Sequence, residues 1–382
     1  MNQQDSPSLA DRVAAFGQFG AACGILQQAV TARAFPGCSF GVLAEGQVVL
    51  ENAIGRFTYQ EDSPAVTRET VYDLASLTKV AATTAMAMLL HQRRQIDLET
   101  RLADLLPELM EGRELGSSAS RITLRHLLSH SSGLPGYVEL FRSATSPELL
   151  LRACLQLPLE AEPGVRVEYS DPGFILLSKG LEAAAGEKFD NWVQREIFEP
   201  LRMTATAFRR AGAQGGSSIP PTETDSRFRC RQIQGEVQDE NAWVLGGVAG
   251  NAGLFSNVSD LLRLANEILS AKGYPGRPTA KIFDRATIEL FAERQPPGGN
   301  SFAVGWDTPS GNSSSGKYFS RHSIGHLGFS GCSLWIDLEA GVAIVLLTNR
   351  TWPDRQSQLI KTVRPAFHDA VREALGSASP HL

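Results

Sequence analysis

The chain opens with apolar residues three or four positions apart, a spacing that predicts a helix over residues 9–34. Pro36-Gly37 follows and ends this helix. Two short apolar runs, at 38–43 and 48–53, then flank a glycine-containing turn, which predicts a β-hairpin. A further extended segment is expected at 71–74. The chain therefore begins as a helix followed by sheet-forming segments.

Helical spacing dominates the next part of the chain, from residue 76 to about 201. The segments expected to be helices are 76–92, 123–129, 147–155, 173–185 and 189–198. Residues 209–241 are polar and contain several glycines and prolines. Their length and composition predict an irregular excursion or a functional loop.

Strand character returns in the last third of the chain. After a helix at 259–269, the expected strands are 302–306, 323–328, 332–337 and 342–348, and a closing helix spans 358–375. Sheet-forming segments thus lie at both ends, which predicts an α/β layer made from the two termini beside a helical domain. The expected boundaries are 1–75 together with 245–382 for the sheet domain and 76–244 for the helical domain. We expect the active site in the cleft between them.

Composition is that of an ordinary globular protein, with 42% hydrophobic and 20% charged residues in 382. The formal net charge is -5 and the basic residues are spread out, which argues against a nucleic-acid partner. The most apolar segment, 80–90, is shorter than the roughly 20 residues that span a bilayer. Five widely spaced cysteines favour free thiols, and residues 1–11 lack a secretory signal, so a cytoplasmic location is expected.

The strongest chemical signal is the segment Ser76-Leu77-Thr78-Lys79. A serine hydroxyl is a weak nucleophile that needs a base within hydrogen-bond reach. If Ser76 opens a helix, Lys79 lies on the same face and its amine can reach the hydroxyl. The helix N-terminus would also favour a developing oxyanion. By itself, the pair is also compatible with a helix cap followed by a solvated lysine.

Two further segments follow in order, Tyr169-Ser170-Asp171 and His326-Leu327-Gly328. With Ser76 and Lys79 they resemble the three motifs of the serine β-lactamase and penicillin-binding superfamily, S-x-x-K, Y-x-N and K-T-G or H-x-G. The match is nearest to class C β-lactamase-like hydrolases, DD-peptidases and esterases, and runs nearly the full length. The accessory segments that also resemble this family are 122–134, 246–256 and 325–337.

The resemblance implies a mostly antiparallel sheet covered by helices beside an all-helical domain, the β-lactamase/transpeptidase-like fold. It implies that Ser76 forms an acyl-enzyme and that Tyr169 and Lys79 share the proton transfers, leaving open which is the base. The second oxyanion donor would be the backbone N–H of Phe329, after Gly328, and His326 would face the substrate or its carboxylate.

Two departures from the family pattern affect the expected substrate. Asp171 stands where Y-x-N enzymes have an asparagine, and an ionised carboxylate only accepts hydrogen bonds. A negative charge near Lys79 would favour its ammonium form and make Tyr169 the base. His326 replaces a lysine and is mostly neutral near pH 7, which weakens carboxylate binding. Both changes shift the expected substrate from β-lactams towards esters.

Other segments carry chemistry-like patterns that we interpret as structural. The segment 37–41 matches G-x-S-x-G, but Ser39 lies in a predicted hairpin and not at a strand-to-helix turn. His126 and His130 are four residues apart, yet lack a third metal ligand nearby and are expected to be packed or capping residues. Asp239-Glu240-Asn241 is expected to have a structural role near the cleft rim.

Aromatic side chains offer a further set of cavity candidates. Because such residues are more often core than ligand contacts, their roles stay open at this point. The candidates are Tyr137, Trp243, Trp306, Phe329 and Trp335.

The sequence therefore predicts a serine hydrolase that acts through a covalent acyl-enzyme on a small-molecule ester, amide or β-lactam, with no cofactor and no metal. Carboxylesterase-like activity with weak β-lactam hydrolysis is the favoured interpretation. A true β-lactamase or D-alanyl-D-alanine carboxypeptidase is the alternative, and a non-catalytic penicillin-binding sensor or scaffold is a second one. The oligomeric state is left open.

Overall fold

The computed structural model describes residues 17–212, 216–274, 279–311 and 313–376. A five-stranded antiparallel sheet runs in the order β2-β1-β10-β9-β8, so its strands come from both ends of the chain. These strands are β1 (Gly37–Ala44), β2 (Gln47–Gly55), β8 (Ile324–Leu327), β9 (Ser333–Asp337) and β10 (Val342–Thr348).

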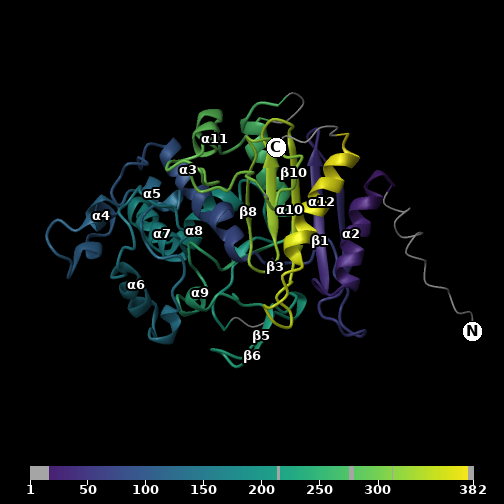
Figure 1. The fold of residues 1–382 in the computed structure, drawn as a ribbon, viewed down its shortest axis with the longest axis horizontal. Coiled ribbons are helices and arrows are strands. Elements are labelled where there is room, and N and C mark those ends of the chain that lie inside the picture. The colour runs from purple at the N-terminus through teal and green to yellow at the C-terminus, as the bar shows by residue number, and fades with distance from the viewer. Residues whose placement is uncertain (1–16, 213–215, 275–278, 312, 377–382) are drawn as a thin grey trace, which may run out of the picture.

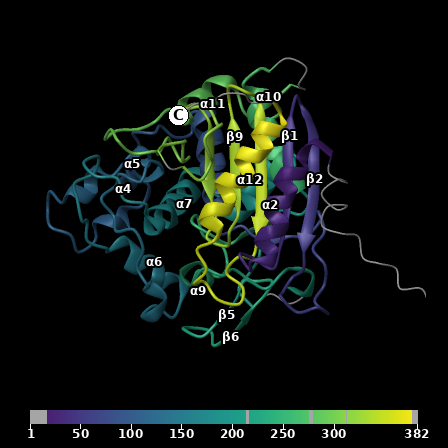
Figure 2. The same ribbon diagram turned by 45° about the vertical axis from the view of Figure 1, so that its right-hand side comes forward.

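Two helices from opposite ends of the chain cover one face of this sheet. In Figures 1 and 2 the purple α2 (Gly20–Thr31) and the yellow α12 (Ile360–Ala374) lie side by side in front of the strands. Phe40 of β1 meets Phe367 of α12 edge to face, with ring centroids 5.7 Å apart. The amphipathic α10 (Val258–Ala271) covers the opposite face of the sheet, where it packs on β1 and β10.

The helical part of the molecule lies beside this layer and appears in blue and teal in Figure 1. No strand falls between residues 76 and 201, a stretch that the structure describes completely. Its longer helices are α3 (Ala85–Gln92), α6 (Pro147–Leu155) and α7 (Asp171–Ala185), and its shorter ones are α4 (Leu102–Leu105), α5 (Leu124–Leu128) and α8 (Phe189–Val193).

Short elements complete the fold between the two parts. β3 (Tyr72–Asp73) and β4 (Ala207–Phe208) pair with β7 (Leu254–Ser256), and β5 (Glu223–Asp225) pairs with β6 (Arg231–Ile233). The remaining helices are α9 (Glu240–Val244) and α11 (Arg285–Phe291). β4, β5 and β6 lie inside the predicted helical domain 76–244, whose boundaries stay a prediction. No helix among the described residues is long and apolar enough to cross a membrane.

The predicted fold class is confirmed, and most elements lie where they were expected. The expected strand at 302–306 is wrong. Gly305 has a φ of 84°, and a Cβ there would lie 2.3 Å from Thr84 Oγ1, so the segment is a tight turn packed on a helix. The helix expected to begin at residue 9 is present from residue 20, and residues 9–16 lie outside the described residues.

Candidate active site

The turn before Ser76 holds a strained backbone. Ala75 has a φ of 46°, a left-handed conformation that costs a residue with a Cβ about 1–2 kcal/mol. Buried Asp73 supports it, because Oδ1 accepts the Ala75 N–H at 2.8 Å and Oδ2 accepts the Gln238 N–H at 2.7 Å. Ser76 follows in the 3₁₀ turn Ala75–Leu77 and is partly exposed. The strain fixes where the Ser76 side chain emerges.

Lys79 is fully buried and all three of its N–H donors have acceptors. Its Nζ donates to Ser76 Oγ at 3.0 Å, to Asp171 Oδ1 at 2.5 Å and to the Asn251 carbonyl at 3.3 Å. Burial lowers the pKa of Lys79, but the charges and hydrogen bonds of Asp171 and Tyr169 outweigh it and raise that pKa above its ordinary value. Lys79 is therefore an ammonium at neutral pH.

Tyr169 lies beside this ammonium, with its ring centroid 4.8 Å from Lys79 Nζ. Its ring also packs against His130 at 4.5 Å, and His130 Nδ1 accepts the N–H of Ser170. Burial raises the pKa of Tyr169, and Asp171 raises it further, whereas Lys79 and hydrogen bonds from Lys79 and Ser76 lower it. The net shift is upward, so the phenol keeps its proton at neutral pH.

The turn between β8 and β9 packs against the residues that precede Ser76. Ser330 Oγ donates to the Asp73 carbonyl at 2.8 Å, and a Cβ on Gly328 would lie only 2.4 Å from the Leu74 carbonyl oxygen. Gly328 therefore permits a close approach that a larger residue would prevent. Through these contacts Phe329, whose side chain is 48% exposed, is held next to the Ser76 turn.

His326 is buried at the end of β8 and is neutral. Its Nδ1 lies 2.8 Å from the Leu327 carbonyl, which can only accept, so Nδ1 carries the proton and Nε2 is an acceptor. Burial and the charge of Lys79 lower the pKa of His326 to about 3. This side chain cannot supply a positive charge for a substrate carboxylate.

One cavity of about 540 Å³ collects the predicted site residues. Ser76, Tyr169 and Asp171 line one part of it, and the β8–β9 turn lines another. Lys79 lies behind Ser76 and Asp171 and is bonded to both. Three motifs separated by up to 250 positions in the sequence thus meet at a single site, and Asp171 is the residue that links the second motif to the first.

Several residues at the same cavity escaped the sequence analysis. Phe302 lines it from the turn that was expected to be a strand. Arg350, Arg355, Lys361 and Arg364 line it from the segment after β10. Spacing gave no signal for them, because they become neighbours only when α12 packs back on the sheet.

The other segments with chemistry-like patterns are structural in this fold. Ser39 is fully buried in β1, where Oγ donates to the Thr67 carbonyl at 2.8 Å. His126 caps α5 with Thr123, and His130 packs behind Tyr169. No three histidine, cysteine, aspartate or glutamate side chains of the described residues form a group that could hold a metal.

Asp239 and Glu240 line the cavity that contains Ser76, and Asn241 is buried next to them. Asp239 accepts the Ala242 N–H and caps α9, Glu240 pairs with Arg355, and Asn241 binds the backbone of Phe141. Burial, and then the charge of Asp171, raise the pKa of Asp239 to about 7. The segment therefore holds neighbouring elements together at the cavity wall.

The aromatic candidates divide between the cavity and the core. Tyr137 and Phe329 line the cavity that contains Ser76. Trp306 and Trp335 are buried in the core, and Trp243 donates its Nε1–H to Glu236 at 2.8 Å. Only the first two are placed to contact a substrate.

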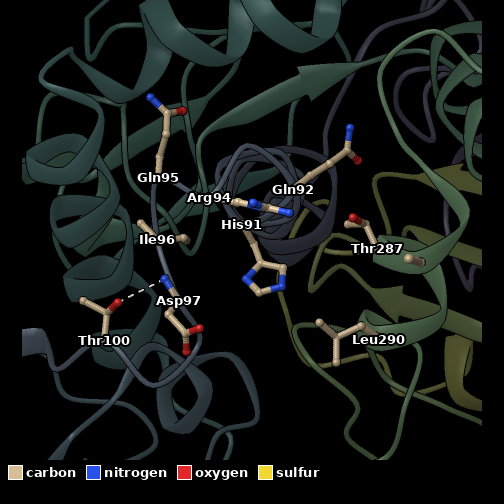
Figure 3. A pocket seen from close by; sticks show the side chains of 10 residues that line it. His91, Gln92, Arg94, Gln95, Ile96, Asp97, Thr100, Thr287 and Leu290 are labelled. Carbon is tan, nitrogen blue, oxygen red and sulfur yellow. Dashed lines mark hydrogen bonds between the residues drawn. The ribbon is translucent and has the colours of Figure 1, made fainter.

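A second cavity, of about 630 Å³, lies at the end of α3 next to α11. Figure 3 shows His91, Gln92, Thr287 and Leu290 around it. None of the predicted catalytic residues lines this cavity, and its lining contains no serine or cysteine nucleophile. Size therefore does not single out a candidate site, and we take the cavity where the three motifs meet as the candidate active site.

Comparisons with known proteins agree with this geometry. Residues 24–364 match the protein family described as Beta-lactamase. The chain is 27% identical over 348 residues to the N-acetylmuramyl-L-alanine amidase of Bacillus subtilis strain 168, covering 84% of this chain and 78% of that one. It is 28% identical over 347 residues to a putative D-alanyl-D-alanine carboxypeptidase of Salmonella agona strain SL483, covering 83% and 79%.

Among solved structures, the fold is similar to that of EstCE1, a hydrolase with promiscuous acyltransferase activity. The TM-score is 0.72 at 22% identity, over 95% of this chain and all of that one. The family match spans most of the chain, including the Ser76, Tyr169 and His326 segments. The chain therefore belongs to the beta-lactamase family of serine hydrolases.

Proposed function

We propose that this chain hydrolyses esters and related amides by forming an acyl-enzyme on Ser76, with carboxylesterase-like specificity. The observation that carries this proposal is the arrangement of Ser76, Lys79 and Asp171. In this arrangement the Ser76 hydroxyl lies beside the charged Lys79 ammonium, and the third motif contributes a neutral histidine to the same cavity. Such a site suits a neutral ester better than an anionic β-lactam.

In the proposed mechanism Ser76 Oγ attacks the substrate carbonyl carbon, and its proton passes to Tyr169 in the small fraction of molecules in which this phenol is ionised, a fraction that grows as the pH rises above neutrality. Because Lys79 is already protonated, it serves as the electrostatic partner that stabilises the phenolate and the developing negative charge. The backbone N–H groups of Ser76 and Phe329 are the proposed oxyanion donors. The phenol then returns the proton to the leaving group as the carbonyl re-forms.

Deacylation repeats these steps with water as the nucleophile. Tyr169 takes a proton from the water as it attacks the ester carbonyl of the acyl-enzyme. The bond to Ser76 Oγ breaks and the proton returns to Ser76, so the enzyme is regenerated and the acid is released. No redox partner is needed.

A second candidate function is hydrolysis of an amide in a peptide-like substrate. The names of two relatives, an amidase and a putative carboxypeptidase, favour it. Asp171 weighs against the family's usual acylamino recognition, since it is an acceptor where an asparagine would donate. The two candidates share the acyl-enzyme and differ only in the leaving group that the cavity accepts.

The test compares turnover of a p-nitrophenyl ester, nitrocefin and a peptide ending in D-Ala-D-Ala. We expect the ester to give the highest kcat/KM, and peptide cleavage without ester turnover would reverse the ranking. Labelling with a fluorophosphonate followed by peptide mass spectrometry should place the adduct on Ser76 and lose it in Ser76→Ala. An adduct on Ser39, or a Ser76 adduct without turnover of any substrate, would reject the catalytic proposal.

A further inference from the structure

Phe329 leaves about half of its surface uncovered in the cavity that contains the proposed nucleophile. It is 48% exposed, and it lines the same cavity as Ser76. Tyr137, which also lines this cavity, is the next most exposed of the described aromatic residues, at 46%. Single exposed apolar side chains are ordinary on a protein surface, but two exposed aromatic side chains in one cavity indicate contacts with a ligand.

Two guanidinium groups hold the Phe329 ring in place. The guanidinium carbon of Arg350 lies 4.4 Å from the ring centroid, and that of Arg355 lies 5.6 Å from it. Arg350 is itself fixed, because its Nε donates to the Phe329 carbonyl at 2.8 Å and its Nη1 donates to the Ser357 carbonyl at 3.0 Å. Cation–π contacts to groups held in this way restrict the ring. The exposed part of Phe329 is therefore a surface of fixed orientation.

The second guanidinium belongs to an ion-paired group that also reaches the other exposed aromatic residue. Arg355 pairs with Glu223 and with Glu240, and the Tyr137 hydroxyl lies 3.5 Å from Glu240 Oε2. Tyr137 and Phe329 thus contact opposite members of the Glu240–Arg355 pair. Because these charges neutralise one another, this part of the cavity wall offers a substrate mainly aromatic surface.

The place of Phe329 in the chain brings its side chain close to the proposed reaction centre. Its backbone N–H is the second proposed oxyanion donor. Ser330 Oγ donates to the Asp73 carbonyl at 2.8 Å, which joins this turn to the residues before Ser76. A substrate group that is separated from the scissile carbonyl by a short chain can therefore reach the ring.

We propose that Phe329 is a specificity-determining residue whose ring stacks on an aromatic ring of the substrate. The inference rests on the proposed acyl transfer by Ser76 and names the substrate class of that site, an ester or amide that carries an aryl group a short chain away from the scissile bond. Stacked aromatic rings gain more than burial of their area provides. An aliphatic ring of similar size buries a comparable area and lacks this additional attraction.

The experiment uses two matched pairs of esters in which phenyl is compared with cyclohexyl, with acid release followed at constant pH. One pair varies the acyl side, methyl 3-phenylpropanoate against methyl 3-cyclohexylpropanoate. The other varies the leaving group, 2-phenylethyl acetate against 2-cyclohexylethyl acetate. Hydrophobic burial alone would favour the cyclohexyl members. The wild-type chain should instead prefer the phenyl member of one pair by about three- to tenfold in kcat/KM, and that pair shows on which side the aryl group binds.

Phe329→Leu keeps an apolar side chain and removes the ring, so the ratio of kcat/KM for phenyl over cyclohexyl should fall to about one or below. Phe329→Tyr restores the ring and should restore the ratio. The matched control is Tyr59→Leu, because the Tyr59 ring also lies near a guanidinium, that of Arg33 at 5.1 Å, but outside the cavity lining. It should keep the wild-type ratio. A ratio of two substrates does not depend on the amount of folded enzyme.

Equal or greater turnover of the cyclohexyl esters by the wild-type chain would overturn the proposal, and so would a phenyl preference that persists in Phe329→Leu. Because Phe329 is half exposed, its replacement should leave the chain folded, which the thermal midpoint checks. A folded wild-type chain that hydrolyses none of the four esters would instead reject the proposed function.

Discussion

The ammonium of Lys79 and the carboxylate of Asp171 form a buried ion pair at 2.5 Å directly beneath the proposed nucleophile. The same ammonium donates to Ser76 Oγ at 3.0 Å, so the carboxylate acts on the serine through the lysine. Asp171 was expected to change the charge state of Lys79, and the geometry supports that hypothesis. It also raises the pKa of Tyr169, an effect that the sequence did not reveal.

Replacing Asp171 with Asn should move the pH–rate profile of kcat/KM to lower pH. The carboxylate raises the pKa of Lys79 and of Tyr169, so its removal lowers both. In the wild-type chain the rate should rise with pH above neutrality as Tyr169 ionises, and in the variant this rise should begin earlier. A matched control is Asp190→Asn, which removes a partly buried carboxylate that is ion-paired with Arg210 outside the cavity. Superimposable profiles of Asp171→Asn and wild type would contradict the assignment.

Replacing Tyr169 with Phe should lower kcat/KM by about 10²–10⁴-fold, the usual contribution of a positioned acid–base group. The ring packing against His130 is retained, so the thermal midpoint should change little. Tyr137→Phe is the control, because Tyr137 lines the same cavity and is 46% exposed. If both variants kept nearly full ester turnover, Tyr169 would not be the base.

Gly331→Ala should destabilise the chain and slow turnover together. Gly331 has a φ of 102°, and a Cβ would lie 2.0 Å from Thr348 Oγ1 and 2.6 Å from Arg350 Cγ. We expect a loss of about 2–4 kcal/mol in the free energy of unfolding by urea, since the β8–β9 turn must shift. Gly112→Ala is a matched control with a φ of 70° and open space around the new Cβ.

Gly112→Ala bears only the cost of placing a Cβ on a left-handed backbone. Its free energy of unfolding should therefore fall by about 1 kcal/mol, and its activity should be retained. An equal loss of stability in the two glycine variants would mean that the crowding at Gly331 is relieved without cost. Unchanged turnover in Gly331→Ala would show that the β8–β9 turn does not position Phe329.

The sequence predicted most of the fold because its elements carry strong local signals. The β1–β2 hairpin and α6 have regular apolar spacing and clear turn or cap residues, and their positions were predicted to within two residues. The turn at 302–306 was mistaken for a strand because its continuous apolar run reflects burial in a turn that bonds to Leu128 and Phe291, and an apolar run alone does not distinguish a buried turn from a strand. Short helices such as α11 have too few turns for the helical spacing of apolar residues to be recognised in the sequence.

Residues of the candidate site could be predicted from the sequence only where they belong to a short sequence motif. Ser76 and Lys79 are three residues apart, and Tyr169 and His326 each lie in a short pattern. Arg350 and Lys361 belong to no such pattern, and their place at the cavity depends on how α12 returns across the sheet. The neutral state of His326 and the charged state of Lys79 likewise depend on burial and on neighbours that tertiary packing supplies.

Stability should fall as the pH is lowered from about 6.5 towards 3. Burial lowers the pKa of His368 to about 3, below its ordinary value of 6.5, and it has the same effect on His326. The folded chain therefore binds fewer protons than the unfolded chain in this window, so acid favours unfolding. Each such site contributes up to about 1.4 kcal/mol per pH unit.

His368→Gln separates one of these sites from the rest. Its side chain would lose hydrogen bonds to Ser333 and to the Ser314 carbonyl, so stability at pH 7 should fall by about 1–2 kcal/mol. Between pH 6.5 and 4.5, however, the free energy of unfolding measured by urea titration should fall less steeply with pH in the variant than in wild type. The difference between the two slopes should correspond to about one bound proton. Parallel pH dependences of wild type and His368→Gln would mean that His368 is protonated in the folded chain.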